Sequence, residues 1–223
     1  MAGCVTGGTR VDQLILAAED DPRRGGHGCR IGILALQGGV AEHVRMLDQI
    51  GVEPVLIRRV GELDRIDGII LPGGESSTID RLLRIFGLAE PLADRIGGGL
   101  PTLGTCAGLV LLAARVADPA PGQRSLGILD VTVHRNAFGS QVESEEAVVQ
   151  THGGPVGAAF IRAPIVTDVG AAVDVLAHHR GQIVAVSSGA VTGLSFHPEL
   201  AGDGAFHRRL VEQARVFAAT ATN

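Results

Sequence analysis

Residues 99–112 read Gly-Leu-Pro-Thr-Leu-Gly-Thr-Cys-Ala-Gly-Leu-Val-Leu-Leu, and this stretch decides the fold that we expect. Its apolar start predicts a short buried strand over residues 100–103, and its apolar end predicts a helix that begins near Ala107. Between them lies a Gly-x-Cys-x-Gly turn, the thiol version of the Gly-x-Ser-x-Gly nucleophile elbow. A buried structural cysteine in a Gly-rich turn is the alternative, because free cysteines are often buried.

The expected position of Cys106 at a helix N-terminus suits a nucleophile. Free N–H groups and the positive end of the helix dipole favour the thiolate over the thiol. The N–H of the next residue, Ala107, would point at the oxygen of a carbonyl that Cys106 attacks. The turn therefore predicts covalent catalysis by a cysteine.

The N-terminal half of the chain alternates between apolar strands and helices. Strands are predicted at residues 30–36, 53–58, 68–71 and 100–103, and helices at 40–50, from the turn at 72–78 to 86, and at 90–96. This alternation predicts an α/β fold of three layers, in which a mostly parallel central sheet carries helices on both faces. Ligands of such sheets bind outside the carboxyl ends of the strands, where the Gly-rich turns at 72–78 and 104–108 both fall.

Beyond residue 115 the pattern changes to short β-like runs and one last helix. The runs are residues 126–134, 147–150, 158–162, 173–178, 182–187 and 190–196. The helix at 204–219 is amphipathic and is expected to pack against the sheet. Since no repeat or linker divides the chain, we predict a flexible tail over residues 1–29 and one domain over residues 30–223.

Composition narrows the possible functions. With 223 residues, 45% of them hydrophobic and 19% charged, the chain suits one globular domain. A net charge of -5 without a basic run argues against partners such as nucleic acid or an anionic membrane. No apolar run approaches the ~20 residues of a membrane span. The three cysteines are odd in number and show no metal spacing, so we expect a cytoplasmic protein without a metal.

A thiolate nucleophile needs a base that a third group orients. The segment Ser-Phe-His-Pro-Glu-Leu at residues 195–200 offers both groups. Pro198 favours an extended backbone at His197, so that the side chains of His197 and Glu199 face the same side. An ordinary polar turn at a strand end is the alternative. Four other histidines show no comparable partner and are expected to be solvated: His152, His178, His179 and His207.

Together, Gly-Thr-Cys-Ala-Gly at 104–108 and His-Pro-Glu at 197–199 resemble the class I, or triad, glutamine amidotransferases. Four further segments narrow the resemblance to the glutaminase subunits of pyridoxal 5′-phosphate synthases. They are Leu-Ala-Leu-Gln-Gly at 34–38, Leu-Pro-Gly-Gly-Glu-Ser at 71–76, Arg-Asn-Ala-Phe-Gly-Ser-Gln-Val at 135–142 and Phe-Ile-Arg-Ala-Pro at 160–164. The last two are not shared by the other triad glutaminases. The resemblance implies the flavodoxin-like fold of that class.

The resemblance also implies a reaction and a partner. Cys106 would attack the side-chain amide of L-glutamine, His197 would act as the base, and Glu199 would orient His197. The products would be glutamate and ammonia, and the ammonia would pass to a synthase subunit of the PdxS type in a hetero-oligomer. No cofactor is implied for this chain, because pyridoxal 5′-phosphate is the product of the partner.

The glutamine-binding positions of the family correspond to six residues: Gly74, Glu75, Ser76, Arg135, Ile161 and Arg162. An arginine such as Arg135 can clamp the α-carboxylate of glutamine with two N–H groups, while Glu75 can face the α-ammonium. The oxyanion hole is expected at the N–H groups of Gly74 and Ala107.

One position departs from the family's pattern, since Glu145 stands where the family usually places Phe. A charge fills an apolar slot only at a cost, so a catalytically silent subunit that binds the synthase stays an alternative. A cysteine hydrolase of the α/β-hydrolase type is another. Its acid would precede the histidine in the chain, whereas Glu199 follows His197.

Overall fold

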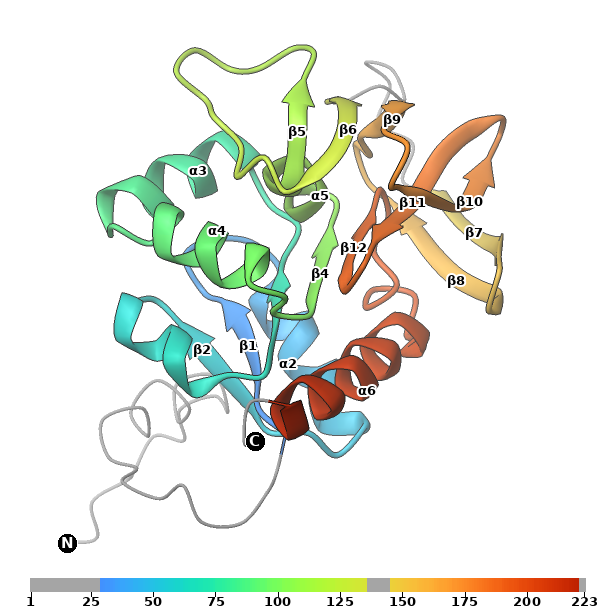
Figure 1. Cartoon of the computed structure of the whole chain (residues 1–223). Helices are drawn as coiled ribbons and strands as arrows, with labels where there is room; N and C mark the ends of the chain where they lie inside the picture. The colour runs from blue at the N-terminus through green and yellow to red at the C-terminus, as the bar shows by residue number, and fades with distance from the viewer. Residues whose placement is uncertain (1–28, 136–144, 221–223) are drawn as a thin grey trace, which may run out of the picture.

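The computed structural model describes residues 29–135 and 145–220 (Figure 1). Its helices are α2 (Val40–Gln49), η1 (Val60–Arg65, a 3-10 helix), α3 (Ser76–Ile85), α4 (Ala89–Gly97), α5 (Ala107–Leu112) and α6 (Ala205–Thr220). The first strands are β1 (Ile31–Leu34), β2 (Pro54–Ile57), β3 (Gly68–Leu71), β4 (Thr102–Thr105), β5 (Ala113–Val116) and β6 (Leu129–His134). They are followed by β7 (Glu145–Thr151), β8 (Gly154–Phe160), β9 (Ile165–Val169), β10 (Asp174–His179), β11 (Gln182–Ser188) and β12 (Val191–Leu194).

Two parts of the sequence interpretation lie outside the described residues. These are the tail, apart from Cys29, and the part of the Arg-Asn-Ala-Phe-Gly-Ser-Gln-Val segment that follows Arg135. The division into a tail over 1–29 and a domain over 30–223 therefore stays a prediction.

One side of the central sheet is entirely parallel. The strands β2, β1, β3, β4 and β12 are neighbours in that order and all run parallel. With β12 in fifth place, this is the 2-1-3-4-5 order of flavodoxin-like folds. Strands β1, β3 and β4 are buried from end to end, as strands covered on both faces must be. The predicted α/β fold with a mostly parallel central sheet is confirmed.

Two apolar cores lie on the two faces of this sheet and make the fold three layers thick (Figure 1). On one face, helices α3, α4 and α5 contribute Leu83, Leu92 and Leu109. On the other face, helices α2 and α6 contribute Leu47 and Leu210. The amphipathic helix expected near the C-terminus therefore packs on the sheet as α6.

The other half of the sheet is mixed, which the sequence interpretation did not include. Beyond β12 the 10-stranded sheet continues through β11, β9, β6 and β5, and β10 pairs with β11. All these ladders are antiparallel except β5 with β6. Strands β5 and β9 went unpredicted because each buries a single residue fully and shows neither an apolar run nor alternation.

The strand before Cys106 also differs from the prediction, because β4 begins and ends two residues later than expected. Gly104 and Thr105 pair with Gly193 and Leu194 of β12, so strand pairing rather than apolarity sets the end of β4.

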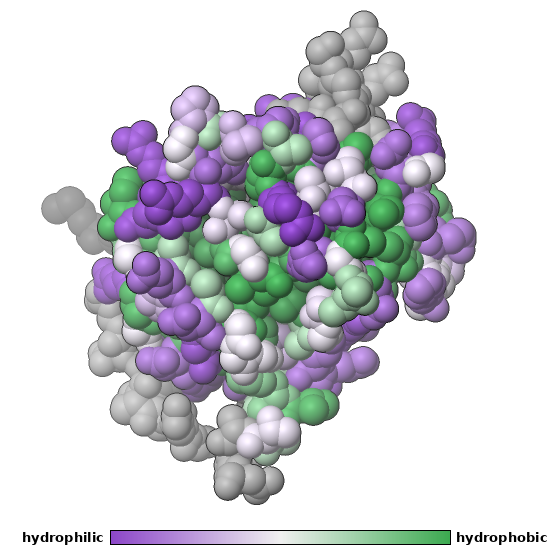
Figure 2. Space-filling model, turned by 45° about the horizontal axis from the view of Figure 1, so that its top comes forward, coloured by the Kyte–Doolittle hydropathy of each residue, from purple (hydrophilic) through white to green (hydrophobic). Residues whose placement is uncertain are grey.

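When the molecule is tilted so that the top of Figure 1 comes forward, apolar side chains gather in the middle of the surface and hydrophilic ones surround them (Figure 2). No helix in the described parts of the chain is long and apolar enough to cross a membrane.

Candidate active site

Cys106 connects β4 to α5 through a backbone conformation that side chains rarely adopt, with φ 49° and ψ -102°. Such strain persists only where the surrounding structure enforces it. Two glycines make the turn possible. A Cβ on Gly108 would overlap the carbonyl oxygen of Leu71, and a Cβ on Gly104 would lie 2.7 Å from the backbone of Gly108. The structure therefore has the strand–turn–helix elbow that the sequence predicts.

His197 and Glu199 follow β12 and lie beside the elbow. The backbone of His197 forms a β-bridge with Ala159 of β8, and His197 Nδ1 lies 2.7 Å from Glu199 Oε1. Burial lowers the pKa of His197, but hydrogen bonds and charge interactions with Cys106 and Glu199 outweigh this effect and raise the pKa to about 10. Burial raises the pKa of Glu199, but His43 and the hydrogen bond with His197 lower it below its usual value. Close contact of these groups favours a charged imidazolium at His197, between the Cys106 sulfur and the Glu199 carboxylate.

The Gly-rich turn after β3 is held against this histidine. A Cβ on Gly73 would overlap the His197 ring, so the bare backbone packs on the imidazole. The Gly73 carbonyl accepts a hydrogen bond of 3.0 Å from the N–H of Gly39. Because C=O and N–H point in opposite directions across a trans peptide, the N–H of Gly74 points away from Gly39.

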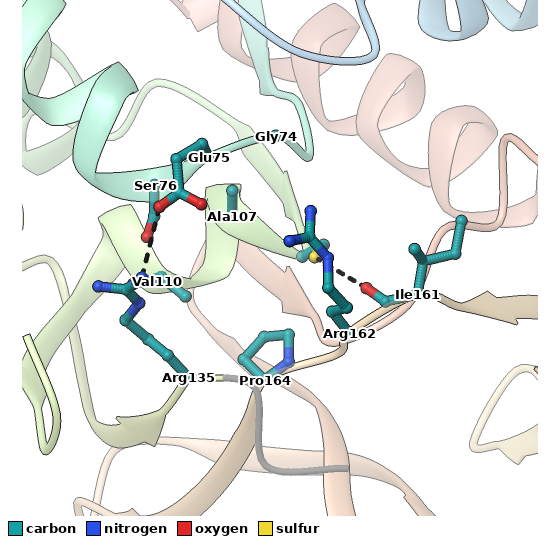
Figure 3. A pocket seen from close by; sticks show the side chains of 10 residues that line it. Gly74, Glu75, Ser76, Ala107, Val110, Arg135, Ile161, Arg162 and Pro164 are labelled. Atoms are coloured by element: carbon teal, nitrogen blue, oxygen red, sulfur yellow. Dashed lines mark hydrogen bonds and ion pairs between the residues drawn. The ribbon is translucent and has the colours of Figure 1, made fainter. Parts of the chain in front are cut away.

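One pocket brings together most of the residues singled out from the sequence (Figure 3). Its lining comprises Gly74, Glu75, Ser76, Cys106, Ala107, Val110, Arg135, Ile161, Arg162 and Pro164. All six positions that match the glutamine-binding residues of the family are present, together with the nucleophile candidate and both oxyanion candidates. His197 and Glu199 do not line the pocket, but the His197 side chain forms a hydrogen bond with Cys106, which does.

Arg135 brings a positive charge to this pocket, and its side chain is only 16% exposed. Its Nη1 donates to Gln123 Oε1 at 2.7 Å. Its Nη2 lies 3.4 Å from Glu75 Oε1 (Figure 3). Gln123 in turn donates from Nε2 to Ser76 Oγ at 3.0 Å. Glu75 also caps α3 by accepting from the N–H and hydroxyl of Ser77. Gln123, which the sequence interpretation missed, thus holds Arg135 beside the start of α3.

The far side of the pocket comes from the turn after β8, where Ile161 and Arg162 lie (Figure 3). The Ile161 carbonyl oxygen lies 4.0 Å from Cys106 Sγ. Arg162 has a φ of 44°, a strained conformation for a side-chain-bearing residue. Strain of this kind is typical of functional sites.

The prediction that His207 is solvated is wrong. His207 and His43 are both fully buried, and His43 Nδ1 lies 2.9 Å from His207 Nε2. Burial lowers the pKa of both, that of His207 to about 3. A sequence signal exists, because His207 shares helical spacing with the buried residues Leu210, Val211 and Ala214. Among the other three, His152 and His178 are exposed as expected, while His179 is partly buried and stacks on Phe160.

Glu145, the departure from the family's pattern, is paired rather than buried in an apolar slot. Its Oε1 accepts a hydrogen bond of 2.8 Å from Arg180 and lies 3.5 Å from His179 Nε2. Glu145 stands opposite Phe160 at the open end of the β7–β8 hairpin.

Across residues 29–135 and 145–220, no three His, Cys, Asp or Glu side chains gather as a metal site requires.

Comparisons with known proteins agree with this geometry. Residues 33–216 match the SNO glutamine amidotransferase family. The pyridoxal 5′-phosphate synthase subunit PdxT of Acidothermus cellulolyticus is 51% identical over 199 residues, which cover 84% of this chain and 96% of that protein. The subunit of the same name from Parafrankia sp. is 55% identical over 189 residues, 83% of this chain and 93% of that protein. A crystal structure of a glutamine amidotransferase is 41% identical and superposes with a TM-score of 0.78, over 82% of this chain and 98% of that one. Because the family model matches most of the chain, and the PdxT subunits match it along nearly their whole length, the chain belongs to the SNO glutamine amidotransferase family.

Proposed function

We propose that this chain is the glutaminase subunit of a pyridoxal 5′-phosphate synthase and that it hydrolyses L-glutamine through Cys106, His197 and Glu199. The observation that carries the proposal is the pocket that Cys106 shares with Gly74, Arg135 and Ile161. The pocket supplies a nucleophile, an oxyanion donor and a cation for a carboxylate, and His197 with Glu199 beside Cys106 supplies the acid–base pair that the reaction also needs. The names of the PdxT relatives support the assignment to a synthase complex.

The first half of the reaction transfers the glutamyl group to sulfur. The Cys106 thiolate attacks the side-chain amide carbon, and the N–H groups of Gly74 and Ala107 stabilise the negative oxygen that forms. His197 then gives its proton to the amide nitrogen as the C–N bond breaks, and ammonia leaves. A thioester between glutamate and Cys106 remains.

The second half hydrolyses the thioester. His197, now neutral, takes a proton from water, whose oxygen attacks the thioester carbon through a second tetrahedral intermediate. The C–S bond breaks, glutamate leaves, and the thiolate is restored beside the imidazolium. Glu199 keeps the ring oriented throughout, because its Oε1 lies 2.7 Å from His197 Nδ1.

Free glutamine carries two charges at its α-carbon, and the pocket offers partners for both. The Arg135 guanidinium suits the α-carboxylate, because a planar fork of N–H donors matches two carboxylate oxygens. The Glu75 carboxylate and the Ile161 carbonyl suit the α-ammonium, while Ser76 and Arg162 line the same pocket. This pairing would select free glutamine over glutamine within a peptide.

Replacing Arg135 by alanine is expected to raise the KM for glutamine far more than it slows the reaction of Cys106 with a small uncharged alkylating agent. Loss of a buried charge-assisted pair costs on the order of 2–4 kcal/mol, which corresponds to about 30- to 1000-fold in kcat/KM. Arg115→Ala is the matched control, because Arg115 forms exposed ion pairs with Asp130 and Asp168. Equal loss of glutamine use and of alkylation in Arg135→Ala would instead indicate a structural role.

The isolated chain is expected to hydrolyse glutamine slowly and to improve when a PdxS-type synthase subunit docks and receives the ammonia. The glycines at 73 and 74 let the oxyanion peptide rotate at little steric cost, and one missing donor slows such reactions about 100- to 1000-fold. Glutamate release by the chain alone is compared with release as the synthase is titrated in. A rate that the partner leaves unchanged would contradict coupling at this turn. No release even at saturating partner would indicate a silent subunit and overturn the proposed function.

A further inference from the structure

A buried chain of polar contacts lies behind Glu199, and the mechanism above does not use it. His43 Nε2, on helix α2, is 3.5 Å from Glu199 Oε1 and 3.3 Å from Thr105 Oγ1. His43 Nδ1 is 2.9 Å from Nε2 of His207 on helix α6. Thr105 Oγ1 also accepts a hydrogen bond of 3.1 Å from the N–H of Gly73. His43, Thr105 and His207 are all fully buried.

We propose that His43 is a positioning residue of the triad, which donates its Nε2–H to the Glu199 carboxylate and the Thr105 hydroxyl while His207 holds it in the required tautomer. The proposal rests on the proposed function, because it gives the triad a fourth, supporting side chain. Groups that orient a catalytic histidine or carboxylate fix its geometry and its charge.

The tautomer follows from what each nitrogen faces. If His207 donates from Nε2 to His43 Nδ1, then His43 carries its hydrogen on Nε2 and presents it to the negative Oε1 of Glu199. His207 Nδ1, which is buried without a partner among the described residues, is then a bare lone pair. The opposite arrangement would bury an unpaired N–H at His207 and turn a lone pair toward the carboxylate. Both are costly, so the first arrangement is favoured.

The position of His43 links two halves of the site. Through Glu199 it supports the orientation of His197, because His43 and His197 both approach Glu199 Oε1, while Oε2 is buried with no partner in the described parts of the chain. Through Thr105 it reaches the residue before Cys106 and the turn at Gly73. A histidine that only filled space would need none of these contacts.

Burial keeps both histidines neutral despite the carboxylates around this cluster. Burial is the main cause that lowers the pKa of His43, which also faces Glu199, His197 and Glu42. Burial likewise lowers the pKa of His207, which faces His43, Glu199, Asp203 and Arg208. A neutral imidazole carries one N–H, so its tautomer decides which neighbour receives a hydrogen bond.

The test compares His43→Leu, which removes the donor, with His43→Gln, whose amide keeps one donor and one acceptor. Glutamine hydrolysis is measured against pH with the synthase subunit present. We expect His43→Leu to lower kcat about 10- to 100-fold, the range found for groups that orient the ligands of metal sites, with little change in KM. Its acid limb should move to higher pH, because Glu199 protonates more readily without the donor. His43→Gln should restore most of both properties.

Leu47→Ala is the matched control, since Leu47 is buried on the same helix and belongs to its apolar core. It should lower the melting temperature without moving the pH profile. A His43→Leu variant with the kcat and pH profile of the wild type would overturn the proposal.

Nitrogen NMR of the wild-type histidines tests the same point without a variant, and so covers the case in which His43→Leu fails to fold. The proposal expects a neutral His43 with its hydrogen on Nε2, and a hydrogen on Nδ1 would overturn it. If the wild type releases no glutamate with the synthase present, the proposed function is overturned instead. The tautomer of His43 would in that case still show whether its Nε2–H donates to Glu199.

Discussion

Replacing Cys106 by alanine is expected to lower kcat for glutamine hydrolysis by about 10^4- to 10^6-fold, the range seen when the nucleophile of a triad is removed. Without sulfur no thioester forms, and a water molecule in the same pocket is a poor nucleophile. The measurement is glutamate release in the presence of the synthase subunit. A variant that retained more than a hundredth of the wild-type rate would contradict covalent catalysis.

Selective labelling provides the control for Cys106. An electrophilic analogue of glutamine should alkylate Cys106 and spare Cys29, because burial raises the pKa of Cys29 to about 11 and keeps it a thiol. Peptide mapping identifies the labelled cysteine. Cys29→Ala should leave both the labelling and the activity unchanged. Label spread evenly over the cysteines would show that Cys106 is not activated.

Replacing Glu199 by glutamine is expected to lower kcat by about 10^4-fold, as when the acid of a serine triad becomes an amide. The amide can turn an N–H toward His197 Nδ1, which favours the tautomer that cannot accept a proton at Nε2. The imidazolium also loses the negative charge that helps to raise its pKa. The basic limb of the pH–rate profile should therefore move to lower pH.

Two further measurements check this prediction. Asp168→Asn also replaces an acid by its amide, but the side chain of Asp168 is 69% exposed, so the activity should not change. The second measurement is the free energy of unfolding against pH. The pKa of His197 is about 10 in the folded state and ~6.5 in an unfolded chain, so protonation of His197 stabilises the fold, and fully so below about pH 6.5. That contribution to the free energy of unfolding is lost as the pH rises through 10. The Glu199→Gln variant should lose less stability over the same pH range, because the pKa of its His197 is raised less. An unchanged kcat in Glu199→Gln would remove Glu199 from the mechanism.

Much of the parallel half of the fold could be predicted because its signals are local. Apolar runs such as Gly68–Leu71 are strands buried on both faces, and amphipathic spacing marked the helices. The elbow at Cys106 was predictable for the same reason, since two glycines and a strand–helix boundary stand within five residues. The pairing of His197 with Glu199 needed only an extended backbone before Pro198.

The sequence by itself thus determined the elements, the elbow and the histidine–glutamate pair, each of which depends on neighbours along the chain. Only the tertiary structure decided the mixed half of the sheet, the hold of Gln123 on Arg135, and the burial of His43 against His207, which lie 164 positions apart. A polar side chain pays for burial only when a partner satisfies it, and that partner is supplied by packing rather than by local pattern. His207 shows the helical spacing of a buried residue along the chain, but its partner His43 is supplied only when α6 packs against α2.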